Sequence, residues 1–74
     1  TESRFEKLSK NLPWNNQLFA TITNETCDYL KKIDKDPTFE NILNTIMEIY
    51  NYCVIKNDGK FDSRFQEWYV QEHL

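Results

Sequence analysis

The chain has very few of the residues that make tight turns, with one Gly and two Pro among its 74 residues. Strands joined by tight turns need Gly, Pro or Asn at frequent intervals, so a sheet-rich fold is disfavoured. It also contains no apolar run near the roughly 18 residues that a membrane span requires, and no basic segment followed by an apolar one at its start. We therefore expect neither a transmembrane helix nor a signal peptide, and no membrane partner.

No charge of one sign dominates, because the net charge is only -3 and the lysines are scattered among acidic residues. Such a chain has no field that would steer a polyanion. The single histidine, His73, has no Cys, His or carboxylate spaced to join it in a zinc site. A small bundle also rarely encloses a pocket in which a nucleophile and a base could converge. The sequence predicts no enzyme, metal, cofactor or small-molecule substrate.

Large aromatic residues are plentiful, with five Phe, two Trp and four Tyr. A chain of this length buries only about 60% of the surface exposed by its unfolded form, so its core must be dense. Aromatic side chains supply a large buried area per residue. The composition therefore favours one small domain over residues 1–74. The start at Thr1 leads us to expect that this domain is excised from a larger protein.

The clearest pattern lies between Asp36 and Gly59, where apolar residues recur with a helical period. Asp36 followed by Pro37 is typical of an N-cap and a first helical position, and Asn57-Asp58-Gly59 is typical of a helix end. We expect a helix from Pro37 to about Lys56. The residues expected on its buried side are Phe39, Ile42, Leu43, Ile46, Met47, Ile49, Tyr50, Cys53 and Val54.

Three further segments have the same period. A short first helix carries Phe5, Leu8 and Leu12 and ends before Pro13. A second helix is expected from about Asn15 to Asp34, with Trp14 folded back on Leu18 as a hydrophobic staple. A fourth is capped by Asp62 or Ser63. Its inward side is expected to hold Phe61, Phe65, Trp68 and Tyr69. Short connections favour antiparallel neighbours, so the sequence predicts an all-α, three- or four-helix bundle built on an antiparallel helical hairpin.

The two cysteines, Cys27 and Cys53, are expected to remain unpaired. In the predicted hairpin Cys27 faces position 44, which is about 13 Å along the helix from Cys53. A disulfide requires Cα atoms within about 7 Å of each other. Two free thiols fit a reducing compartment, so we expect an intracellular location, cytoplasmic or nuclear.

Residues 57–62 are similar to the middle of an EF-hand calcium loop. With Gly59 at the sixth loop position, however, Val54, Lys56 and Phe65 occupy positions that need oxygen ligands. A capped turn between two helices accounts for the same residues, and calcium binding is not expected.

Some apolar residues do not fit the predicted core. Tyr52 and Ile55 lie within the polar side of the third helix, while Val70 and Leu74 point away from the inward side of the fourth. A second apolar surface on a small domain can mark a partner site or a homodimer interface. Alternatively, the bundle covers more of each helix than a single apolar arc suggests.

From these residues the sequence predicts a protein-protein interaction or oligomerisation module. The expected partner is another protein or a second copy of the chain, with Trp68 and Tyr69 as anchors beside the four residues above. The alternative is a nucleic-acid-binding helical domain, in which basic residues near aromatic ones would contact phosphates; these are Lys31, Lys32, Lys35 and Arg64. Salt separates the two, because phosphate binding weakens steeply as salt rises.

Overall fold

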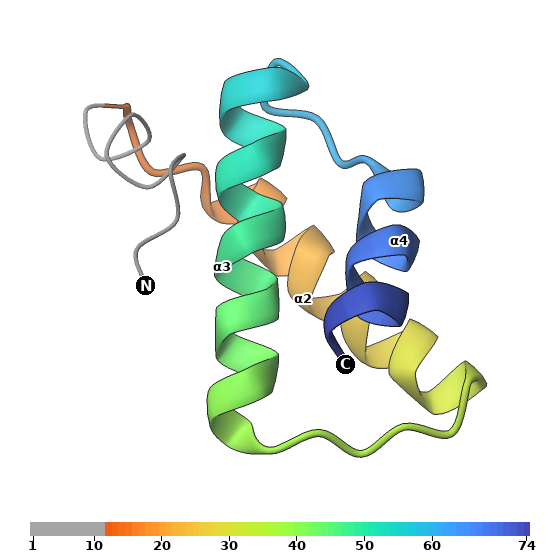
Figure 1. Cartoon of the computed structure of the whole chain (residues 1–74). Helices are drawn as coiled ribbons and strands as arrows, with labels where there is room; N and C mark the ends of the chain where they lie inside the picture. The colour runs from red at the N-terminus through yellow and green to blue at the C-terminus, as the bar shows by residue number, and fades with distance from the viewer. Residues whose placement is uncertain (1–11) are drawn as a thin grey trace.

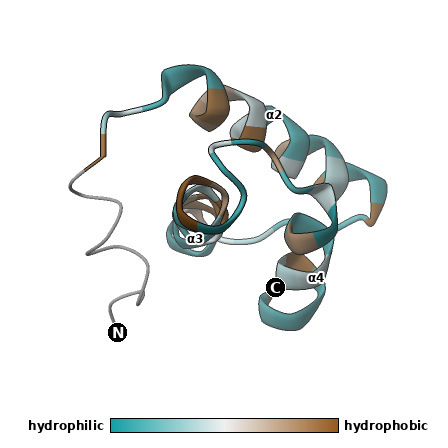
Figure 2. Cartoon of the chain, turned by 90° about the horizontal axis from the view of Figure 1, so that it is seen from above, coloured by the Kyte–Doolittle hydropathy of each residue, from teal (hydrophilic) through white to brown (hydrophobic). Residues whose placement is uncertain are grey.

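The computed structural model describes residues 12–74, which form three α-helices and no strand. They are α2 (Asn16–Lys32), α3 (Phe39–Lys56) and α4 (Ser63–His73). α2 and α3 run in opposite general directions and cross obliquely, and α4 returns beside α3 (Figure 1). Seen along α3, the other two helices lie on different sides of it (Figure 2). The prediction of a small all-α bundle is confirmed. The predicted first helix lies mostly outside the described residues.

α2 begins and ends close to the predicted residues. Asn15 is its N-cap, and the Asn15 Oδ1 accepts a hydrogen bond of 3.0 Å from the Leu18 N–H. At the other end Asp34 has a positive φ of 57°. The Lys35 N–H donates to the Leu30 carbonyl at 2.9 Å, and the Asp34 N–H donates to the Lys31 carbonyl at 3.2 Å. These two bonds form a Schellman motif, which ends the helix.

α3 begins two residues later than predicted. Its N-cap is Thr38, not Asp36, because the Thr38 Oγ1 accepts the hydrogen bond from the Asn41 N–H at 3.3 Å. Pro37 therefore precedes the helix and is not its first residue. The predicted end is confirmed: α3 stops at Lys56, and Asp58 and Gly59 follow with positive φ values of 56° and 73°. Of the two predicted caps of α4, Asp62 and Ser63, the structure has Asp62, whose Oδ1 accepts from the Phe65 N–H at 3.1 Å.

The core is formed where α2 and α4 pack against α3 from different sides (Figure 2). Leu18, Ile22 and Leu30 of α2 are buried. α4 contributes Val70, and α3 contributes the largest share. The buried residues of α3 are Thr45, Ile46, Ile49, Tyr50, Asn51 and Cys53. Two of them, Thr45 and Asn51, are not among the residues predicted for the buried side, so α3 is covered over more of its circumference than its apolar arc predicts.

Trp14, which was predicted to pack on Leu18, contacts two aromatic rings. Its ring stacks on Tyr50 with centroids 4.6 Å apart and lies 5.0 Å from the Phe19 ring. The Tyr50 hydroxyl accepts a hydrogen bond of 2.9 Å from the Asn15 N–H. Trp14 and Asn15 therefore attach the start of α2 to Tyr50 of α3.

Both cysteines are free, as predicted. Cys53 is buried in the core and Cys27 is half-buried. Burial raises the pKa of the Cys53 thiol above its ordinary value of 9.0. The thiol is therefore neutral at physiological pH, and it acts as a small apolar core residue.

Candidate functional site

Five rings form a continuous aromatic surface across α3 and α4, which we call the aromatic cluster. The Tyr52 ring of α3 stacks on the Phe65 ring of α4, with centroids 3.8 Å apart and planes nearly parallel. Phe65 in turn lies 5.8 Å from Trp68 and 5.9 Å from Tyr69. His73 completes the cluster, 4.3 Å from Tyr69 and 6.0 Å from Trp68.

The spacing along α4 explains why these rings meet. Phe65, Trp68 and Tyr69 are separated by three and four residues, and His73 follows Tyr69 by four, so all four lie along one side of the helix. The Asp62 cap sets the start of α4 and thereby brings Phe65 opposite Tyr52. One side of a short helix thus gathers four rings.

Trp68 is the most exposed member of the cluster, with 53% of its surface accessible. Phe65 and Tyr69 are half-buried, and their rings pack against the Trp68 indole. Burial raises the pKa of the Tyr69 hydroxyl, and the nearby Glu48 carboxylate of α3 raises it further. The cluster therefore presents an accessible indole, a neutral phenol and one carboxylate at its edge.

α4 is rotated about its axis relative to the prediction. Val70 was expected to point outward, but it is fully buried in the core, and Gln66 is buried beside it. The Gln66 Nε2 donates a hydrogen bond of 2.9 Å to the Thr26 Oγ1 of α2, also buried. The small side chain of Val70 and the paired amide of Gln66 fit in the interior of the bundle, whereas the large rings of α4 lie at its edge.

The predicted site residues are therefore divided by the structure. Tyr52, Trp68 and Tyr69 come together in the aromatic cluster. Ile55 is half-buried and follows Tyr52 by three residues, on the same side of α3. Val70 belongs to the core and cannot contact a partner in this fold. Leu74 is half-buried and follows Val70 by four residues, away from Trp68.

Sequence reasoning missed a second exposed apolar surface. Phe39, Leu43 and Met47 were expected to be buried on α3, yet their exposed fractions are 78%, 40% and 37%. Their spacing places them in one row along the helix, which we call the α3 ridge. The apolar period is as predicted, but within residues 12–74 α2 and α4 cover α3 mainly where Ile46, Ile49 and Cys53 lie, and the ridge stays partly exposed. Phe65 and His73 were also absent from the predicted site, although their spacing from Tyr69 could have identified them.

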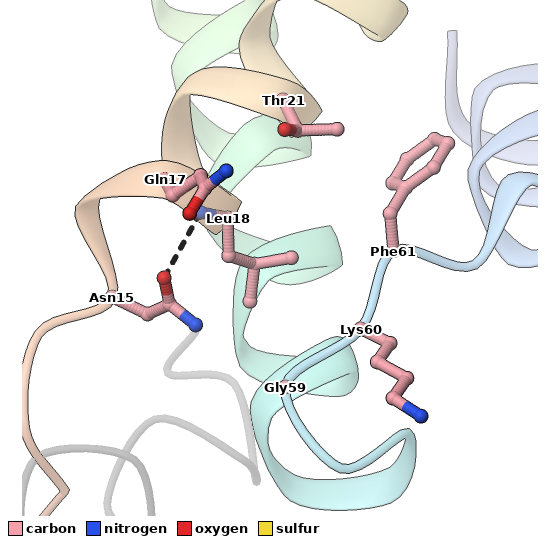
Figure 3. Close-up of a pocket in the computed structure, with 7 residues that line it drawn as sticks. All are labelled: Asn15, Gln17, Leu18, Thr21, Gly59, Lys60 and Phe61. Atoms are coloured by element: carbon pink, nitrogen blue, oxygen red, sulfur yellow. Dashed lines mark hydrogen bonds between the residues drawn. The ribbon is translucent and has the colours of Figure 1, made fainter.

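Two shallow pockets in residues 12–74 are lined by residues outside the aromatic cluster and the α3 ridge. The first, of about 270 Å³, lies where the start of α2 meets the turn after α3 (Figure 3). It is lined by Asn15, Gln17, Leu18, Thr21, Gly59, Lys60 and Phe61. This lining contains no carboxylate, thiol or imidazole and thus no pair of acid and base. The second, of about 210 Å³, lies between α2 and α4 and includes the carboxylates of Glu25, Asp28 and Glu67.

Within residues 12–74, no group of three or more His, Cys, Asp or Glu side chains is arranged to hold a metal ion. In the same range, no helix combines the length and the apolar character needed to cross a membrane. Comparison with family models, with curated proteins and with solved structures gives no match for this chain.

Proposed function

We propose that this chain is a helical protein-interaction module whose aromatic cluster binds an amphipathic helix of a partner protein. The observation that carries the proposal is the exposure of Trp68 at the edge of four packed rings. Tryptophan and tyrosine are the residues most enriched among those that dominate binding energy at interfaces. Because neighbouring rings already restrict the indole, it loses little conformational freedom when a partner covers it.

The geometry also favours a helical partner. The cluster extends along α4 from Phe65 to His73, about 12 Å of helix axis. This length accommodates about two turns of a partner helix, whose apolar residues at i, i+3 and i+4 can pack between the rings. Glu48 supplies a polar group at the margin, where a basic or hydrogen-bonding residue of the partner would lie.

The proposal is tested with a displayed library of amphipathic helical peptides, selected against the full chain. We expect binding peptides whose affinity falls at least tenfold when Trp68→Ala is introduced, because an anchoring residue contributes about 2 kcal/mol or more. The matched control is Trp14→Ala, since Trp14 is equally exposed, at 55%, but lies outside the cluster. Peptides that lose as much affinity with the control, or that never depend on Trp68, would contradict the proposal.

A further inference from the structure

We infer that the helix bound by the aromatic cluster is α4 of a second copy of the chain, and that the two α4 helices pack antiparallel about Trp68. The inference rests on the proposed function, because it names the partner of the same surface. It starts from Arg64, Trp68 and Glu72, which follow one another at intervals of four residues and so form a row along one side of α4. All three side chains are exposed. α4 lies at one edge of the bundle, with α2 and α3 on its other sides (Figure 2).

The two charges of this row are placed against the preference of α4 itself. Arg64 is the second residue of the helix, and Glu72 is the last but one. A helix favours anions near its N-terminus and cations near its C-terminus, by about 0.3–1 kcal/mol each, so both residues have the unfavourable sign. Within residues 12–74 neither side chain has an ion-pair partner that would offset this cost. Charges supplied from outside the chain would account for both positions.

An antiparallel pair of α4 helices supplies these charges. With a two-fold axis at Trp68 the two indoles meet, and each Arg64 faces Glu72 of the other copy, because both lie about 6 Å along the helix from Trp68. The symmetry forms two ion pairs at once. A parallel pair would instead set Arg64 against Arg64 and Glu72 against Glu72, which is unfavourable. A row with spacing i, i+4 and i+8 is also the ridge that packs between two helices at about -50°.

Other helices fit this row less well than α4 does. An uncharged apolar helix would cover Trp68 but leave both charges without partners. A uniformly basic helix would oppose Arg64, and a uniformly acidic one would oppose Glu72. The row needs a partner with an acidic residue and a basic residue on opposite sides of a large apolar one, four positions away from it in each direction. α4 itself has this order of residues.

Glu48 of α3 adds a second carboxylate at the acidic end of the row. Its charge contributes to the raised pKa of the Tyr69 hydroxyl, and Glu72 follows Tyr69 by three residues, so the two carboxylates lie at the same end of the aromatic cluster. Arg64 of the second copy would therefore approach two carboxylates. The planar guanidinium of Arg suits such pairing and also stacks on aromatic rings.

The expected dimer is a transient one, because a contact centred on one short helix of each copy belongs to the small class of interfaces. Its apolar part is the pair of Trp68 indoles, which gain from offset or edge-to-face packing. Its ion pairs lie at the two ends of the row and are screened by salt. The dimer should therefore weaken moderately, but not disappear, as salt is raised.

Charge exchange tests the inference by sedimentation equilibrium of the full chain between about 10 µM and 1 mM, the range of a weak contact. The dissociation constant should rise about tenfold with Arg64→Glu and equally with Glu72→Arg, because each substitution makes both symmetric pairs repulsive. The double variant should return to within about threefold of the parent, since the same pairs form again with their charges exchanged. Both substitutions agree better with the dipole of α4, so neither threatens folding, and the unfolding temperature of the monomeric variants should not fall.

The matched control is Lys31→Glu, an exposed residue of α2 whose reversal changes the net charge by the same amount as Arg64→Glu. This control should change the dissociation constant less than about twofold, because it is remote from the row. Trp68→Ala should weaken the dimer about tenfold, as expected of an anchoring residue.

A chain that stays monomeric throughout this range, while selected peptides still bind through Trp68, overturns the inference and leaves the proposed function standing. A dimer that does not respond to Trp68→Ala, that the double variant fails to restore, or that Lys31→Glu weakens as much as Arg64→Glu does also overturns it. A further outcome concerns the monomer. If Trp68 is shielded from acrylamide at concentrations where the chain is monomeric, another part of the same chain covers the row, and the inference fails.

Discussion

The rotation of α4 can be tested by comparing Val70→Ala with Trp68→Ala, because the two possible orientations predict opposite rankings. Val70 is fully buried, and the substitution removes apolar groups worth about 0.8 kcal/mol for each methylene equivalent. With the cavity included, the free energy of unfolding should fall by about 2 to 3 kcal/mol. Trp68 is half-exposed and loses mainly its contacts with Phe65 and His73, so its loss should be about 1 kcal/mol.

Urea unfolding followed by far-ultraviolet circular dichroism measures both losses. A charged pair of variants widens the difference: Val70→Asp buries an unpaired carboxylate, which costs more than about 4 kcal/mol and leaves little of a small domain's stability. Trp68→Asp should still fold, because its carboxylate reaches water. If Trp68→Ala costs more than Val70→Ala, or if Trp68→Asp unfolds the chain while Val70→Asp does not, then α4 has the opposite orientation and the aromatic cluster is core.

Three further predictions concern the rest of the fold. Thr26→Val should lower the free energy of unfolding by about 1 to 3 kcal/mol because it leaves the buried Gln66 amide unpaired. In a double-mutant cycle with Gln66→Leu, the double variant should lose less than the sum of the two single losses. Gly59→Ala should cost about 1 kcal/mol through its positive φ alone, whereas Asp34→Gly should gain up to about 1 kcal/mol at its own positive φ, both measured by urea midpoint. The raised pKa of Cys53 means that, as pH rises, its thiol ionises first in the unfolded chain, so the free energy of unfolding should fall above about pH 9. A thiol reagent at pH 7 should modify Cys27 in the folded chain but Cys53 only after unfolding. Equal reactivity of both thiols would refute the last of these.

The helices could be predicted from the sequence because their signals are local. The apolar period of residues 39–54, the start of α2 near Asn15 and the Asp62 cap depend on neighbours within about one turn of the helix. The start of α3 was missed by two residues because Asp36 and Thr38 are both good caps. Which of them accepts the first hydrogen bond depends on the path of the link from α2, which no local pattern specifies.

The candidate site was only partly predictable because it depends on how much of each helix its neighbours cover. α4 has apolar residues on two sides, and the spacing of Phe65, Trp68 and Tyr69 is as suitable for a core as for a surface. The structure places Val70 and Gln66 inside, where Gln66 has a polar partner in Thr26 that lies 40 residues away in the sequence. The exposed α3 ridge was missed for the same reason, since an apolar arc does not reveal which part of it remains uncovered.

The account rests on Trp68 being an accessible anchor that a partner helix covers. In a Trp14→Phe background Trp68 is the only tryptophan, so its fluorescence reports on the aromatic cluster alone. We expect the emission of the free chain to lie at the long wavelength of a solvated indole and to be quenched readily by acrylamide. A selected helical peptide should shift this emission to shorter wavelength and protect it from quenching. An emission that is already short and protected in the free chain, or that no bound peptide changes, would contradict the account.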